Sequence, residues 1–292
     1  APGAAAEGAH GGIADAGPWW AGAKQREIRM SRHTDQSIIV TGAAGAIGFA
    51  TCEILVREGA KVLMVDINAP RLAERSSALG TRGGRVEACV ADCGEEADVR
   101  RYAQAAVDAF GRIDGFFNNA GVEGKLAPTH EYDVAEFDRL MRVNLRGVFL
   151  GLRHVLPFMV QQGAGAVVNM ASIGSERGLA GACAYNAAKH GVVGLTRTAA
   201  SEVAQKGVRV NCVMPGVIET PLLVEVIEQL FPGNVQKGLD KLGQVATLNR
   251  CGRPEEVGNV VSFLLSAESS YVNGAKWEID GGALATIRND LA

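Results

Sequence analysis

Short apolar runs alternate with longer amphipathic stretches along most of this chain. The apolar runs hold five or six residues each, which suits strands that are buried on both faces of a sheet. The expected strands are residues 37–41, 61–65, 85–90, 113–117, 166–170, 208–213 and 275–279. Because strands that alternate with helices form parallel sheets, we expect an α/β fold of Rossmann type. It should be a doubly wound parallel sheet of about seven strands in a single domain.

The stretches between these runs have the apolar spacing of helices that cover a sheet. We expect helices over residues 49–57, 95–110, 134–161, 182–204 and 255–265. Residues 217–248 are apolar in their first half but lack a clear period, so we expect an irregular segment there.

The first 34 residues lack this alternation. They are rich in Ala and Gly, and they have no basic start followed by an apolar core, so they do not resemble a signal peptide. Met30 is the first Met, which suggests a natural start there. The pair Trp19-Trp20 is unusual in a disordered tail and suggests instead a segment that docks. We therefore expect an extension over residues 1–34 and a catalytic domain over residues 35–292.

Composition narrows the classes of partner. The formal net charge is −3 and no run of five basic residues occurs, so we expect no nucleic-acid partner. No apolar run approaches the ~18 residues of a membrane span, so we expect no membrane partner. The six cysteines form no C-x-x-C pair and have no His at zinc-like spacing, which indicates no metal site and a reducing, cytoplasmic compartment.

A glycine-rich turn follows the first expected strand and leads into a helix. Small residues at 42–48 would let the backbone approach a pyrophosphate, whose charge meets the helix N-terminus. An ordinary strand-to-helix turn is the alternative interpretation. Asp66 makes it less probable, because this acid ends the next strand 18 residues after Gly48, close to the ~20 expected for a carboxylate that binds the adenosine ribose.

Tyr185 and Lys189 are four residues apart, so a helix would place them on one face. A phenol has an ordinary pKa of about 10 and is a poor base at neutral pH. A nearby ammonium favours the phenolate, so we expect the pKa of Tyr185 to be lowered. Ser172 follows an apolar run, and its hydroxyl could hold the oxygen that Tyr185 protonates or deprotonates. The Tyr-x-x-x-Lys spacing alone is weak, because most such pairs are solvated helix residues.

Between residues 37 and 282 the chain resembles the short-chain dehydrogenase/reductase family. The resemblance rests on motifs that occur in order, each at the end of an expected strand or on an expected helix. They are Thr41-Gly42-x-x-x-Ala46-x-Gly48, Asp92, Asn118-Asn119-Ala120-Gly121, Asn144, Ser172, Tyr185-x-x-x-Lys189, Pro215-Gly216 and Thr220. Ala46 departs from the family, which more often has Gly there.

The resemblance implies a role for each catalytic residue. Tyr185 would be the acid/base, and Lys189 would lower its pKa and hold the nicotinamide ribose. Ser172 would bind the reacting oxygen, and Asn144 would position a water for proton relay. The implied cofactor-binding residues are Gly42, Ala46, Ile47, Gly48, Asp66, Asp92, Asn118, Ala120, Gly121, Tyr185, Lys189, Pro215, Gly216, Ile218 and Thr220.

The expected cofactor is NAD. A carboxylate at Asp66 suits the ribose hydroxyls and would repel a 2′-phosphate. The positions where NADP sites carry Arg or Lys hold Ala43, Ala44, Ile67 and Asn68.

The expected reaction interconverts a small secondary alcohol and a ketone. The chain looks like the NAD-dependent reductases of cyclic ketones and diones within the family, and we expect residues 217–248 to form a mobile lid over a mainly apolar pocket. A 3-oxoacyl-carrier reductase and a non-catalytic NAD-binding regulator are the alternatives. We also expect a homotetramer, since outer helix faces would expose Val148, Leu152, Ala187, Ala188 and Val192.

Overall fold

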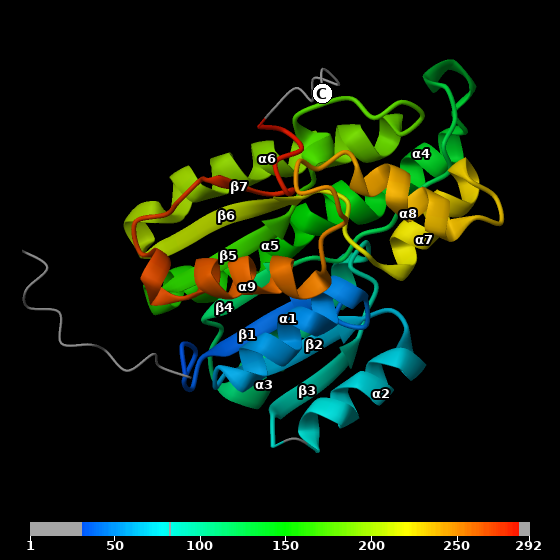
Figure 1. Cartoon of the computed structure of the whole chain (residues 1–292). Helices are drawn as coiled ribbons and strands as arrows, with labels where there is room; N and C mark the ends of the chain where they lie inside the picture. Colours follow the sequence, from blue (N-terminus) through cyan, green and yellow to red (C-terminus); the bar gives the residue numbers. More distant parts are fainter. Residues whose placement is uncertain (1–30, 82, 286–292) are drawn as a thin grey trace, which may run out of the picture. The chain divides into compact units, whose positions relative to one another are not determined.

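The computed structural model describes residues 31–285 except residue 82, and its centre is one sheet of seven parallel strands (Figure 1). The strand order is β3-β2-β1-β4-β5-β6-β7. The strands are β1 (Ser37–Thr41), β2 (Lys61–Asp66), β3 (Arg85–Val90), β4 (Gly115–Asn118), β5 (Gly165–Met170), β6 (Val208–Pro215) and β7 (Lys276–Ile279). The prediction of a doubly wound parallel sheet is confirmed.

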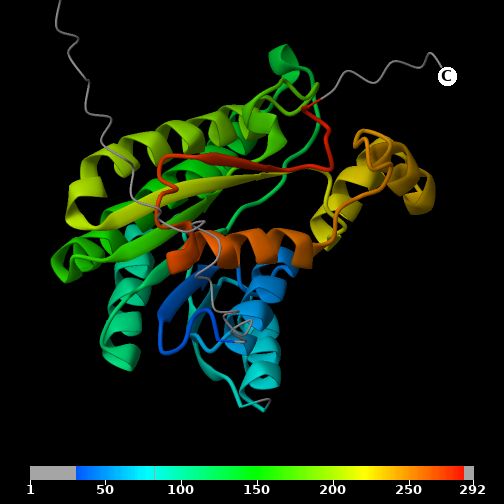
Figure 2. The ribbon, with the colours of Figure 1, turned by 60° about the vertical axis from the view of Figure 1, so that its left-hand side comes forward.

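Helices cover both faces of the sheet, as Figure 2 shows from the side. One face carries α1 (Ala46–Arg57), α2 (Ala69–Gly80) and α9 (Pro254–Leu265). The other carries α3 (Glu96–Phe110), α5 (Gly147–Gln162) and α6 (Cys183–Val203), with α4 (Val134–Met141) leading into α5. Successive side chains of a strand point to opposite faces, so Ile38 and Val40 enter one apolar core and Ile39 enters the other.

The expected helix over 134–161 has an interruption. A single π-helical turn, Arg142–Arg146, separates α4 from α5. Asn144 lies in this turn, and its side-chain amide bonds to the backbone of Val122 instead of pointing to solvent. The bulge turns this polar side chain inward, which a simple apolar period cannot reveal.

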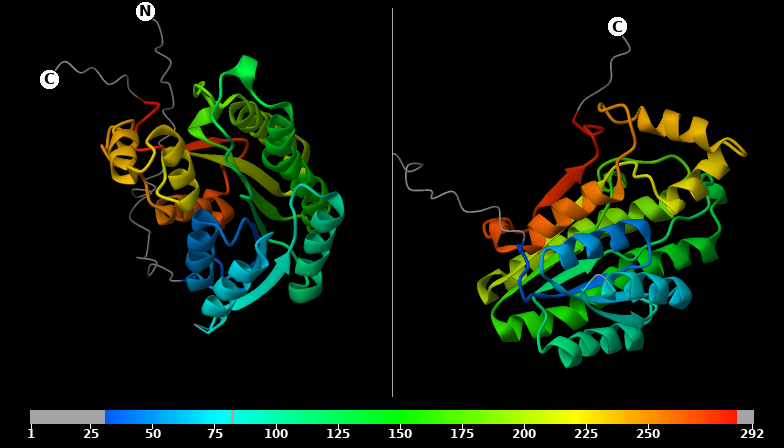
Figure 3. Two further views of the ribbon diagram at one scale, coloured as in Figure 1. Left: turned by 90° about the vertical axis from the view of Figure 1, so that its right-hand side faces the viewer. Right: turned by 60° about the horizontal axis from the view of Figure 1, so that its bottom comes forward.

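Residues 217–248 are more regular than expected. They contain α7 (Pro221–Leu230) and α8 (Val235–Gly243). Thr220 and Asn234 cap these helices by accepting hydrogen bonds from the backbone N–H groups of Leu223 and Lys237. The two helices lie past one end of the sheet, as Figure 1 and the two views of Figure 3 show.

The described domain begins before the expected boundary at residue 35. His33 is fully buried, and its ring bonds to the side chains of Gln36 and Ser262. Arg32 forms an ion pair with Glu58. Ser31 to Thr34 therefore belong to the folded unit, while Met30 and Trp19-Trp20 lie outside the described residues.

The apolar patch proposed for oligomerisation is wrong for four of its five residues. Val148, Leu152, Ala188 and Val192 are at most 5% exposed, because they face the core between the sheet and its helices. Ala187 is exposed. The aromatic ring of Phe149, 45% exposed on α5, was not anticipated.

Two further properties concern the helices and the cysteines. Across residues 31–285, apart from residue 82, no helix is both long and apolar enough to span a membrane. All six cysteines are free thiols.

Candidate active site

A cavity of about 750 Å³ opens at the carboxyl ends of the strands. It lies where the strand order reverses between β1 and β4, the place where open parallel sheets bind ligands. Its lining includes thirteen residues that the sequence predicted for the site. They are Gly42, Ala46, Ile47, Gly48, Asp66, Gly121, Ser172, Tyr185, Lys189, Pro215, Gly216, Ile218 and Thr220.

The glycine-rich turn forms one end of this cavity. Gly42 has a φ of 63°, which favours glycine. A Cβ at Gly48 would lie 2.2 Å from the carbonyl oxygen of Gly42, so no larger residue fits there without a shift of backbone. In the described region no side chain caps the start of α1, which leaves its first N–H groups available to an anion.

Asp66 lies at the same end. Its Oδ2 accepts a hydrogen bond from the Ala44 N–H at 2.9 Å, and its Oδ1 accepts one from the Asn68 N–H at 2.9 Å. These bonds fix the carboxylate against the cavity. Arg71, which the sequence analysis did not single out, lines the cavity as well, from the first turn of α2.

Ser172, Tyr185 and Lys189 meet deeper in the cavity. Ser172 follows β5 directly, and the other two lie one turn apart on α6. The Lys189 ammonium lies 5.6 Å from the centre of the Tyr185 ring and donates a hydrogen bond to the Met170 carbonyl at 2.9 Å. Lys189 is 3% exposed, so its charge is held inside the protein.

The environment shifts both ionisable groups. Burial lowers the pKa of Lys189 to about 8, against the attraction of Glu123. Burial first, and then the Glu123 carboxylate, raise the pKa of Tyr185, while the neighbouring Ser172 hydroxyl acts in the opposite direction. The expected lowering of the Tyr185 pKa is therefore wrong for this structure. Desolvation of the phenolate is the largest cause of this shift.

Asp92, Asn118 and Ala120 do not line the cavity. Asp92 pairs with Arg142 at 2.9 Å and accepts a hydrogen bond from the Gly94 N–H. Asn118 is buried and its Nδ2 donates to the Val148 carbonyl. The N–H of Ala120 donates to the Thr41 hydroxyl.

Asn144 also lies outside the cavity lining, but it holds part of that lining in place. Its Oδ1 accepts from the Val122 N–H at 2.8 Å, and its Nδ2 donates to the Val122 carbonyl at 2.8 Å. The fully buried amide thus fixes the backbone that carries Gly121 and Glu123 toward Lys189.

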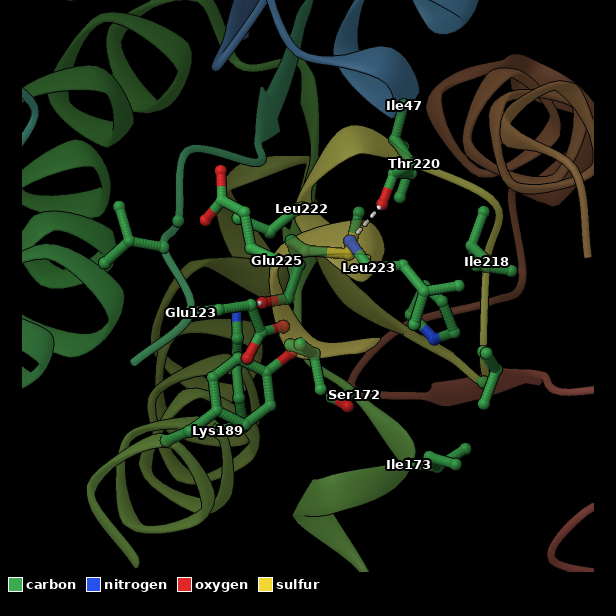
Figure 4. Close-up of a pocket in the computed structure, with 18 of the residues that line it drawn as sticks. Ile47, Glu123, Ser172, Ile173, Lys189, Ile218, Thr220, Leu222, Leu223 and Glu225 are labelled. Atoms are coloured by element: carbon green, nitrogen blue, oxygen red, sulfur yellow. Dashed lines mark hydrogen bonds between the residues drawn. The ribbon is translucent and has the colours of Figure 1, made fainter. Parts of the chain in front are cut away.

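Besides Arg71, three charged residues of the lining were not predicted as site residues: Glu123, Arg177 and Glu225. Figure 4 shows Glu123 beside Lys189 and Glu225 farther from it. Burial raises the pKa of Glu123 to about 6, although Lys189 lowers it. A charged residue after a strand-end motif was a possible signal for Glu123. Nothing in the pattern distinguishes Glu225 from an exposed helix residue.

We find no metal centre among the described residues, since no group of three or more His, Cys, Asp or Glu side chains is arranged to hold an ion. The expected absence of a metal site was an inference from spacing and remains one.

Comparison with known proteins adds a second kind of observation. The family described as enoyl-(acyl carrier protein) reductase matches residues 42–283. Levodione reductase from Leifsonia aquatica is 46% identical over 257 residues, which cover 87% of this chain and 96% of that protein. Cyclohexanol dehydrogenase from Acinetobacter sp. (strain SE19) is 36% identical over 255 residues, with coverage of 87% and 97%.

Solved structures match as well. A crystal structure of levodione reductase superimposes with a TM-score of 0.85 at 45% identity, covering 87% of this chain and 99% of that one. A structure of NAD⁺-bound xylitol dehydrogenase gives a TM-score of 0.80 at 32% identity, with coverage of 85% and 99%.

Proposed function

The chain belongs to the short-chain dehydrogenase/reductase family of oxidoreductases, and from that premise we propose that it interconverts a secondary alcohol and a ketone with NAD as the hydride carrier. The observation that carries the proposal is the single cavity that joins the glycine-rich turn to Ser172, Tyr185 and Lys189. A nicotinamide dinucleotide and a small substrate would share this space.

The residues at one end of the cavity fit the dinucleotide. The uncapped start of α1 suits the pyrophosphate, and Asp66 suits the ribose hydroxyls. The proposed contacts of Asp92 and Asn118 are less direct, since neither lines the cavity. When bound, the nicotinamide supplies the carbon that accepts or gives the hydride.

The protein's own residues would manage the proton. In oxidation, Tyr185 as phenolate would take the proton of the substrate hydroxyl, and Ser172 would donate a hydrogen bond to the same oxygen. Lys189, whose ammonium lies 5.6 Å from the Tyr185 ring centre, would stabilise the phenolate that burial disfavours. Asn144 would act through the backbone of Val122, as a positioning residue.

NAD is proposed over NADP because of the fixed carboxylate of Asp66, whose charge would repel a 2′-phosphate. Arg71 is a cation in the same lining and would favour that phosphate, so both cofactors belong in the test.

Replacement of Tyr185 by Phe tests the proposal. We expect Tyr185→Phe to lower kcat by at least about 10²-fold, the usual contribution of a general acid/base, while NADH binding measured by fluorescence stays within about threefold of wild type. Nicotinamide absorbance would follow cyclohexanol and cyclohexanone with NAD(H) and NADP(H). A variant that retained most of its activity would exclude this role for Tyr185.

The same assay separates two other functions. Faster reduction of a 3-oxoacyl thioester than of any simple ketone would favour a 3-oxoacyl-carrier reductase, the activity named for a relative from Thermotoga maritima that is 37% identical over 246 residues. Binding of NAD with no turnover of any alcohol would favour a regulator.

A further inference from the structure

The cavity has an acidic side at the end away from the glycine-rich turn. Glu123 lies in the connection between β4 and α4, and Glu225 lies on α7. Both line the cavity together with Ser172 and Lys189, and Figure 4 shows the two carboxylates on the same side of the site. The reaction described above uses neither of them.

The backbone on both sides of Glu123 is fixed. Asn144 holds Val122 through two hydrogen bonds of 2.8 Å. Arg139 donates to the carbonyl oxygen of Glu123 at 3.0 Å. The direction of the Glu123 side chain into the cavity is therefore set by the fold.

The helix that carries Glu225 is joined to the same connection. Gln229 of α7 accepts a hydrogen bond from the Leu126 N–H at 2.9 Å and donates one to the Gly124 carbonyl at 3.3 Å. These two bonds keep Glu225 close to Glu123. Two like charges are thus held near each other at the cavity wall.

In the described part of the chain, neither carboxylate group forms a hydrogen bond or an ion pair, although the charge of Lys189 attracts Glu123. An ionised carboxylate offers about four acceptor positions. A half-buried carboxylate that receives no hydrogen bond is energetically unfavourable. A ligand that brought a hydrogen-bond donor would satisfy it.

Glu123 is the nearer of the two to the reacting groups. Its charge affects the pKa of both Tyr185 and Lys189, whereas that of Glu225 affects neither. Glu225 is solvent-exposed and Glu123 is half-buried. A substrate oxygen bound at Tyr185 would therefore place the rest of the molecule beside Glu123.

We propose that Glu123 selects substrates that carry a second hydroxyl group besides the one that is oxidised. This rests on the proposed alcohol–ketone activity and gives it a substrate class, diols and hydroxyketones. The Glu123 carboxylate accepts a hydrogen bond from the second hydroxyl, and Leu222, Leu223 and Val226 of α7 contact the carbon frame. Anionic substrates are disfavoured by the two carboxylates.

Arg177 is a positive charge that would favour anionic substrates, in contrast to the two carboxylates. It lines the same cavity, and its Nε is buried without a partner in the described part of the chain. An anionic substrate would pair with Arg177 and avoid Glu123, so a hydroxy acid is the informative competitor.

The test compares substrates that differ by one hydroxyl group. Values of kcat/KM would be measured for cyclohexanol, the cis and trans forms of 1,3- and 1,4-cyclohexanediol, and 3-hydroxybutyrate. Hydrogen bonds to charged groups are typically worth tenfold or more in affinity, so we expect at least one diol to exceed cyclohexanol by about tenfold in the wild type.

Variants then assign the preference to one residue. We expect Glu123→Leu to reduce the ratio of kcat/KM for the preferred diol to that for cyclohexanol to about one, and Glu123→Gln to retain part of the preference. Glu131→Gln is the matched control, because this exposed acid lies in the same connection but outside the cavity lining. Thermal melting and NADH binding would verify that each variant is folded.

Each result decides the matter. Loss of the diol preference in Glu123→Leu but not in Glu131→Gln supports the proposal. Cyclohexanol oxidation with no diol preference in the wild type, equal losses on both substrates in Glu123→Leu, or highest activity on 3-hydroxybutyrate overturns it and leaves the alcohol–ketone activity standing. Failure of every alcohol with either cofactor overturns both.

Discussion

Lys189 and Glu123 carry opposite charges, lie close together in this cavity and respond to burial with pKa shifts in opposite directions. Lys189 has one protein acceptor, the Met170 carbonyl, and Glu123 has no hydrogen-bond donor among the described residues. Burial disfavours the charged form of each, so the pKa of Lys189 falls and that of Glu123 rises. Their mutual attraction opposes both shifts. At the scale of single residues, the attraction between Lys189 and Glu123 thus offsets part of the unfavourable effect of burying their charges.

The raised pKa of Glu123 predicts a pH-dependent stability. The carboxyl has a pKa of about 6 in the fold and 4.5 as its ordinary value. The folded state therefore binds the proton more tightly than the unfolded state does. Below about pH 4.5 Glu123 does not destabilise the fold, and it destabilises the fold progressively as pH rises through about 6. At about pH 7.5 we expect Glu123→Gln to exceed the wild type by about 1–2 kcal/mol in free energy of unfolding.

Urea unfolding at several values between about pH 4.5 and 7.5 would measure this difference. It should shrink toward the acid end of the range, because the wild-type carboxyl is then protonated in both states. Glu131→Gln serves again as the control and should show no such trend. A difference that stays constant with pH would mean that Glu123 titrates normally.

Asp66 supports a prediction about cofactor choice. The double variant Asp66→Ala/Ile67→Arg removes the carboxylate that would repel a 2′-phosphate and adds a cation at a position that is 66% exposed. We expect the ratio of kcat/KM for NADP to that for NAD to rise by at least about tenfold, equivalent to about 1.4 kcal/mol. A wild type that already uses NADP as well as NAD would contradict the role given to Asp66.

At the scale of elements, the sequence revealed those whose apolar period is strong. All seven strands were predicted, because each is an apolar run, and α3, α6 and α9 were found within about two residues of their ends. Helix α2 was missed. Its apolar contact with the sheet is made chiefly by Leu72 and Leu79, too few for a visible period.

The site divides in a similar way. Residues at strand ends, such as Asp66 and Ser172, were predicted from position because the carboxyl ends of parallel strands meet at one edge. Glu123 and Glu225 were not predicted, because they are brought together only by the packing of α7 against the connection between β4 and α4, which is distant in sequence. The direction of the Tyr185 pKa shift depends on burial, which spacing does not report.

We retain the expectation that residues 217–248 form a lid, and the contact between α7 and that connection leads to a prediction about its motion. Gln229→Ala removes both hydrogen bonds to residues 124 and 126, so we expect backbone amides of α7 to exchange about tenfold faster and KM for the alcohol to rise several-fold. Hydrogen exchange with mass spectrometry would measure the first effect and steady-state kinetics the second.

Gln236→Ala provides the control, since the Gln236 side chain bonds to Asp240 within α8. It should leave α7 unchanged. If α7 in the wild type already exchanges as fast as in Gln229→Ala, the contact does not hold the lid.

At the scale of the whole molecule, the two cores on opposite faces of the sheet leave ten large apolar side chains of the described residues exposed. Phe149 on α5 is one of them, at 45% exposure, and Ala187 on α6 is exposed as well. We retain the expectation of a homotetramer that pairs these helices. The expectation now rests on exposed Phe149, because four of the residues first proposed for the interface are buried.

We expect light scattering at micromolar concentration to give the mass of four chains for the wild type and a smaller mass for Phe149→Arg, because a charge in an apolar interface is unfavourable. Ile67→Arg introduces the same charge at another exposed apolar position, on the loop after β2, and should not change the mass. A monomeric wild type would refute the expectation.

The bonds between Asn144 and Val122 have a consequence for how this protein can vary. The connection that follows is anchored at its other end too, where Asp133 caps α4 by accepting a hydrogen bond from the Glu136 N–H. Residues 124–132 therefore run between two fixed points, so we expect a change in their length to leave the position of Lys189 unaltered. This is where insertion, recombination or laboratory loop grafting would alter the choice of substrate while the hydride-transfer chemistry stays intact.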